Sequence, residues 1–146
     1  MGIFYTLRNK LPSKILQSIY FAFVHPYLLY GIEMYANTYP SYLHKLETLN
    51  NKLLRILQNK PHNSPSNDLY IDHNTLSIPD LHIHQILLFV HKLMYHKHRL
   101  PDIFSNYFRL NNIVHDHDTR GSNGLHVTAV NNNYGRKSIT HKASIP

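Results

Sequence analysis

The chain has 146 residues, no cysteine, and 15 Lys and Arg against 8 Asp and Glu, which gives a net charge of +7 with histidine neutral. This length fits one domain with a hydrophobic core and is too short for two comfortable ones. The missing cysteines exclude disulfides, thiolate metal sites and cysteine nucleophiles. The basic balance favours an anionic partner, nucleic acid ahead of an acidic lipid surface, although charge that serves only solubility stays open.

The N-terminal part predicts two helices separated by a proline. Residues 13–24 form the first, apolar on most sides, with Pro12 in its first turn. Pro26 predicts a break or kink before a second helix over residues 27–36, in which Gly31 permits close packing of a neighbour. The apolar run between Lys14 and Glu33 is too short and too often interrupted for a membrane span, which needs about 20 residues. We therefore expect no membrane partner, and with no signal peptide we expect an intracellular location, cytoplasm or nucleus.

Residues 41–59 give the clearest helical pattern. An apolar stripe with steps of three and four residues is expected to face the core. The stripe consists of Tyr42, Leu46, Leu49, Leu53 and Ile56. Three cations, Lys45, Lys52 and Arg55, lie along its polar flank. The Pro/Ser/Asn-rich stretch 60–68 predicts a loop that ends the helix.

The rest of the chain predicts one more long helix and a polar tail. Residues 79–98 are apolar on most sides, so we expect this helix to be the best buried. A short helix is predicted from Pro101 to Tyr107. We predict an all-α fold, a bundle of four to five helices over residues 1–110, followed by a basic, polar C-terminal extension over 111–146 that is irregular and disordered without a partner.

Catalytic and metal chemistry finds little support in the sequence. There is no P-loop, no G-x-G-x-x-G and no G-x-S-x-G motif, so we expect no enzyme activity, cofactor or small-molecule substrate for this chain alone. His115-Asp116-His117-Asp118 offers metal-binding groups, but adjacent loop residues do not easily converge on one ion. We predict no metal site and keep a histidine-metal protein as a third hypothesis.

Binding remains. Lys45, Lys52 and Arg55 on one helix edge could follow a phosphate backbone, and interleaved tyrosines could stack on bases. The alternative is that the lysines are a solvated face and the tyrosines belong to the core. Spacing alone leaves these two interpretations open.

Several motifs follow one another in a familiar order. They are His25-Pro26-Tyr27-Leu28-Leu29-Tyr30-Gly31-Ile32, then Leu46 to Ile56 with Asn51-Lys52-Leu53-Leu54-Arg55, then Leu76, Ile78 and Leu81, then Leu100-Pro101, Thr119-Arg120 and Tyr134-Gly135-Arg136-Lys137-Ser138. In order and spacing they resemble the segment that follows the palm in non-LTR (LINE-like) retrotransposon reverse transcriptases. The family's Trp residues and its palm, with the paired catalytic aspartates, are absent from this sequence.

The resemblance implies a thumb-like helical unit that grips an RNA/DNA template–primer through its backbone. Lys52 and Arg55 match basic motif positions, and Arg120 is a third candidate beside Lys45. His25, Pro26, Tyr30 and Gly31 match positions that we interpret as architectural. The chain is then expected to be a non-catalytic C-terminal fragment of an RNA-directed DNA polymerase, with Mg²⁺ confined to the missing palm, itself an expected partner. The alternative is a helical protein-interaction module without nucleic-acid binding.

Overall fold

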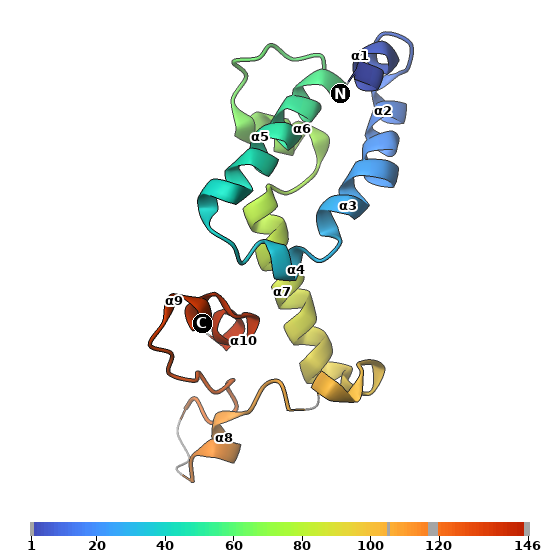
Figure 1. The fold of residues 1–146 in the computed structure, drawn as a ribbon. Helices are drawn as coiled ribbons and strands as arrows, with labels where there is room; N and C mark the ends of the chain where they lie inside the picture. The colour runs from blue at the N-terminus through green and yellow to red at the C-terminus, as the bar shows by residue number, and fades with distance from the viewer. Residues whose placement is uncertain (1, 105, 117–119, 145–146) are drawn as a thin grey trace. The chain divides into compact units, whose positions relative to one another are not determined.

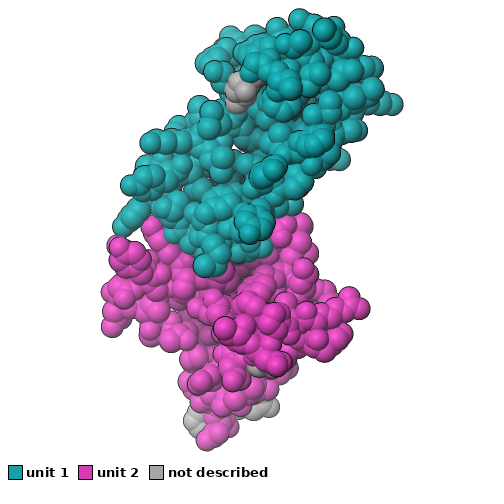
Figure 2. Space-filling model, turned by 45° about the vertical axis from the view of Figure 1, so that its right-hand side comes forward, with its two compact units in different colours: residues 1–82 teal, residues 83–146 magenta. Residues whose placement is uncertain are grey.

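The computed structural model describes residues 2–104, 106–116 and 120–144. Over these ranges the chain forms helices joined by turns and loops, with one isolated bridge between Leu110 and Leu125 (Figure 1). The predicted all-α class is thereby confirmed for the described residues, while the bundle arrangement stays a prediction. The chain divides into two compact units, Met1–His82 and Ile83–Pro146 (Figure 2). The compositional boundary predicted at 110/111 falls inside the second unit.

Unit 1 is built around one hydrophobic core. Its elements are α1 (Gly2–Arg8), α2 (Ser13–Ile19), a π-helical turn (Tyr20–Val24), α3 (His25–Leu29), α4 (Ile32–Tyr35), α5 (Pro40–Leu57), α6 (Ser66–His73) and the start of α7 (Ile78–Tyr95). Core side chains come from most of these helices: Leu16, Tyr20, Leu28, Ile32, Ala36, Leu53, Leu54, Leu57, Leu69, Tyr70, Ile78 and Leu81. The pattern of the sequence had not predicted α1 or α6, which are only seven and eight residues long.

Of the predicted break or kink at Pro26, the break is wrong and the kink stays a prediction. Helical backbone continues from Ser13 to Leu29, and the irregularity takes the form of the π-helical turn just before the proline. There the backbone N–H of His25 donates to the carbonyl of Tyr20, five residues back. Proline lacks an N–H and its ring crowds the preceding turn of an α-helix. A π turn is wider, and it is one of the recognised ways in which a helix accommodates such a residue.

The chain instead leaves the helix at Tyr30 and Gly31. Gly31 has φ +69° and ψ 20°, a left-handed conformation that ends α3 and precedes α4. A Cβ added at Gly31 would meet nothing within 4 Å. The predicted reason for this glycine, close approach of a neighbour, is therefore wrong, and its backbone conformation is the reason instead. The neighbouring Tyr30 side chain is 86% exposed, so its predicted architectural role does not come from core packing.

Helix α5 has nearly the predicted limits, and its predicted stripe is confirmed in part. Leu53 and Ile56 of the stripe are buried, together with Leu54 and Leu57. Tyr42 and Leu49, which were assigned to the same stripe, are 63% and 53% exposed. The buried side also includes Asn50 at 4% exposure. The apolar stripe could not indicate this residue, because its side chain is polar.

Unit 2 contains most of α7, two 3-10 turns (Lys97–Arg99 and Asp102–Phe104), α8 (Asn111–Val114), α9 (Asn133–Lys137) and α10 (Ile139–Ser144). Helix α7 is not the well-buried element that was predicted, since Ile83, Leu87 and Tyr95 are more than half exposed. The helix predicted to reach Tyr107 is only a 3-10 turn ending at Phe104. The described part of the predicted irregular tail holds three short helices and buries Ile139 and Ser144, whereas residues 120–132 contain no helix.

Substituting Gly31 by alanine is expected to lower the free energy of unfolding by about 1–2 kcal/mol, because an L-residue is strained in the left-handed region. Gly2→Ala is the matched control, since its added Cβ also meets nothing within 4 Å and its backbone is helical. Urea denaturation measures both. Equal stability of the two variants would contradict the conformational explanation for Gly31.

Candidate functional site

Lys45 and Lys52 are exposed on the outer side of α5. Seven residues of α-helix separate them, which places them about 10.5 Å apart along the axis and close to the same side. At about 100° per residue, this side lies almost opposite Asn50, the buried polar residue of the helix. The structure therefore presents two of the predicted basic residues together, and the burial of Asn50 fixes which way they face.

Arg55 has a different position. Its side chain is half-buried, and its Nη2 donates to the backbone carbonyl of Ser64 at 2.9 Å. The side chain thus ties the end of α5 to the loop that leads into α6. The neighbouring Lys60 and Asp72 form an ion pair that joins the same loop to α6. Arg55 was predicted to contact phosphate, but the structure gives its guanidinium a contact within the protein.

Arg120, the fourth predicted basic residue, is exposed and belongs to unit 2. This unit carries most of the excess positive charge of the sequence. It has eight Lys and Arg against three Asp and no Glu, a net of +5, whereas unit 1 has seven against five, a net of +2. The sequence predicts a basic C-terminal extension over 111–146, and a charge count over each half of the chain extends this basic character to unit 2 as a whole.

A network of polar side chains crosses the core of unit 1. The Tyr20 hydroxyl, fully buried, donates to Oδ1 of Asn50 at 3.1 Å, and the Tyr70 hydroxyl donates to Oδ1 of Asn51 at 2.5 Å. Burial raises the pKa of both tyrosines above its ordinary value, and the hydrogen-bonding asparagine Asn50 opposes that rise. Both phenols stay neutral near pH 7 and act as hydrogen-bond donors within the core.

His73 lies at the edge of this network. Its imidazole is 4% exposed, meets the Tyr20 ring edge-on at 4.8 Å between centroids, and stacks on Phe21 at 5.8 Å. Nε2 of His73 is buried and has no hydrogen-bond partner among the described residues. Burial lowers the pKa of His73. It also lowers the pKa of His25, the second histidine whose ring lies against Phe21. His25 lies against Phe21, at 5.2 Å between ring centroids, and its architectural role stays a prediction.

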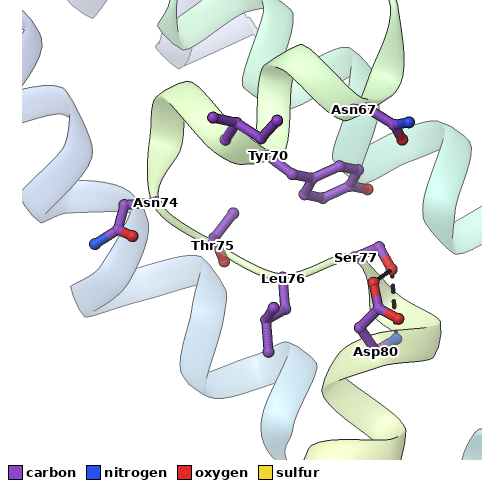
Figure 3. A pocket seen from close by; sticks show the side chains of 8 residues that line it. Asn67, Tyr70, Asn74, Thr75, Leu76, Ser77 and Asp80 are labelled. Atoms are coloured by element: carbon purple, nitrogen blue, oxygen red, sulfur yellow. Dashed lines mark hydrogen bonds between the residues drawn. The ribbon is translucent and has the colours of Figure 1, made fainter.

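An open pocket of about 600 Å³ lies between α6 and the start of α7 (Figure 3). Tyr70, Thr75 and Leu76 form part of its wall, and Asp80 is the one charged residue in its lining. The Ser77 hydroxyl donates to Oδ2 of Asp80 at 2.5 Å and accepts from the backbone N–H of Asp80 at 3.3 Å. This is the capping arrangement that begins a helix, so it explains Asp80 without a ligand.

Unit 2 has a smaller pocket of about 420 Å³ with a different character. Arg109, His126 and His141 line it together with hydroxyl and aromatic side chains, and no carboxylate is among the described residues that line it. Close by in sequence, the pKa of Lys142 is lowered, first by burial and then by the charge of Lys137. None of these residues was selected from the sequence, because they come from separate short segments with no motif.

The part of the chain that the structure describes contains no arrangement of side chains that could hold a metal ion. Among those residues no group of three His, Asp or Glu side chains is placed to hold an ion. His115 and His126 have ring centroids 5.3 Å apart, while His117 and Asp118 of the predicted cluster lie outside the described residues. Within the described ranges, no helix has both the length and the apolar character that a bilayer crossing requires.

Comparisons with known proteins add no identification. No protein-family model, no curated protein and no solved structure matches the chain.

The free energy of unfolding of unit 1 is expected to fall as the pH drops below about 6.5, the ordinary pKa of histidine. Because the folded state lowers the pKa of His73 and His25, the unfolded state binds protons first. Stability is therefore complete above pH 6.5 and is lost below it, at up to about 1.4 kcal/mol per pH unit for each group. Denaturant titrations from pH 7.5 to 5 measure this slope.

His73→Phe keeps an aromatic ring against Phe21 and removes the titration, so it should flatten the slope but not abolish it while His25 remains. His62→Phe, at an exposed loop position, is the control and should leave the slope unchanged. A slope that is the same in wild type and His73→Phe would contradict the assignment.

Proposed function

We propose that the chain is the thumb-like, non-catalytic region that follows the palm in an RNA-directed DNA polymerase of a non-LTR retrotransposon. In this proposal α5 contributes contacts to the backbone of an RNA/DNA template–primer. The observation that carries it is the exposure of Lys45 and Lys52 on one side of α5, at positions in and beside the motif that prompted the resemblance. Two cations on one rigid helix can neutralise two phosphates without reading sequence.

The other predicted residues take secondary parts. Arg55 fixes the loop after α5 through Ser64, and His25 and Gly31 shape the segment that precedes it. Arg120 is a further phosphate contact from unit 2. Nucleotidyl transfer belongs, in this proposal, to the aspartates and Mg²⁺ of a palm, which is also the expected protein partner.

Binding of the purified chain to an RNA–DNA duplex across a salt series tests the proposal. Each phosphate contact contributes about −0.9 to the slope of log affinity against log salt for a duplex. Lys45→Gln with Lys52→Gln should therefore make the slope shallower by about 1.8. Lys92→Gln with Lys97→Gln, two exposed lysines of unit 2, removes the same charge and should change the slope less. Affinity independent of salt, or equal effects of the two pairs, would contradict phosphate contact by α5.

A second candidate function is supported by an apolar groove of about 560 Å³ along α4 and the first half of α5. Met34 and Tyr42, 72% and 63% exposed, border it, with Leu43 and Leu46 at its base. Contiguous exposed apolar surface is typical of protein contacts. These features support the alternative of a helical protein-interaction module, with the palm as the natural partner.

Replacing both Met34 and Tyr42 by glutamine should then reduce the binding of a hydrophobic dye such as ANS to the native chain, because the groove loses its exposed apolar rim. The control replaces Ile103 and Tyr134, which are comparably exposed but do not line the groove. Fluorescence titration and sedimentation velocity provide the measurements. A compact monomer that binds no dye before substitution would rule out the interaction surface.

A further inference from the structure

We propose that the pocket in unit 2 lined by Arg109, His126 and His141 binds the phosphate group of a nucleotide, whose base lies against Tyr107. This site goes beyond the proposed function, since it involves none of the α5 lysines and does not require that the chain derive from a polymerase. It rests on the donor groups of the pocket, on the missing negative charge in its lining and on its aromatic wall.

The donors come from Arg109 and His141. No hydrogen bond or ion pair links the guanidinium of Arg109 to another described residue, so its planar N–H groups are available to pair with two phosphate oxygens. Nδ1 of His141 is buried and lacks a hydrogen-bond partner within the described ranges. A buried polar atom without a partner is costly unless a ligand or water satisfies it.

Most hydroxyl groups in the wall shape the pocket and do not supply free hydrogen-bond donors to a ligand. Ser138 Oγ donates to the carbonyl of Gly135 at 2.7 Å, so in its 3.0 Å contact with Thr140 Oγ1 the proton comes from Thr140. Ser144 Oγ donates to the carbonyl of Thr140 at 2.7 Å. These three protons are thus engaged within the protein. An incoming anion must be bound by Arg109, His141 and the hydroxyl of Thr128, which also lines the pocket.

The charges of the pocket lining and of unit 2 favour an anionic ligand. Among the described residues the lining holds no Asp or Glu, and the surrounding unit has a net charge of +5. An anion meets no opposing carboxylate from these residues, whereas a cationic ligand would be repelled by Arg109. The volume of about 420 Å³ lies within the range of small-ligand pockets, about 300–1,000 Å³.

The aromatic wall favours a nucleotide over a free phosphate. Tyr107 and Phe108 line the pocket, with ring centroids 5.5 Å apart. Phe104 and Phe89 support Tyr107 from behind, at 5.6 Å and 6.1 Å between centroids. Tyr107 is 39% exposed and so offers ring surface to a base. Stacking of a base on an aromatic side chain is worth about 1–3 kcal/mol and tolerates any base.

The test titrates the full chain with adenosine 5′-monophosphate, adenosine and inorganic phosphate by isothermal calorimetry or NMR. The monophosphate should bind more tightly than either of the other two ligands. Arg109→Glu should weaken it by about tenfold or more, because a charged hydrogen bond is lost and a like charge faces the phosphate. Arg99→Glu carries the same change of net charge at an exposed position outside the pocket and should change affinity less than about twofold.

Three results would overturn the site. They are no binding of the monophosphate at millimolar concentration, equal affinity for monophosphate and adenosine or phosphate, or equal effects of the two Arg→Glu changes. Circular dichroism checks folding, and Arg109→Gln with Arg99→Gln replaces the first pair if Arg109→Glu unfolds. Because Lys45→Gln with Lys52→Gln should leave monophosphate affinity unchanged, failure of the duplex test and failure of this one are distinguishable.

Discussion

The hydrogen bond between Tyr20 and Asn50 is the constraint on which the arrangement of unit 1 depends. Both side chains are buried, and 30 residues of sequence separate them. A buried amide is expensive without a partner, so α5 can place Asn50 inward only where the Tyr20 hydroxyl reaches it. That pairing sets the rotation of α5 about its axis. The same rotation turns Tyr42 and Leu49 outward and puts Lys45 and Lys52 on the far side, so a polar contact in the core decides what the surface offers to a partner.

Local signals in the sequence were sufficient for the helical class and for the limits of the long helices. Pro40 begins α5 and the stretch after Leu57 ends it, as turn chemistry predicts. Periodicity predicted Leu53 and Ile56 on the inward face of α5 but not Asn50, because an asparagine is expected at a solvent position until its tertiary partner is known. Gly31 was recognised as special for the wrong reason, since steric closeness and left-handed backbone both favour glycine. The short helices of the tail were missed because four to six residues give no measurable period.

The candidate sites likewise include residues whose positions follow from the local sequence and residues whose positions depend on long-range contacts. Lys45 and Lys52 share one helix, so spacing alone places them together. Arg55 has the same spacing signal, but its bond to Ser64 depends on the path of the following loop. Arg109, His126 and His141 come from three segments of unit 2 and meet only in the folded chain. Charge counted over each unit would have indicated the region, although not the residues.

The π-helical turn has a consequence for how the N-terminal segment tolerates changes in length. A π turn holds one residue more than an α turn, so Tyr20–Val24 is equivalent to a single-residue insertion in a continuous helix. Deleting one residue there would restore regular α-helical geometry and leave the positions before and after the turn in the same phase. The wider turn therefore lets the helix carry one extra residue while Leu16 before it and Leu28 after it both stay in one hydrophobic interior.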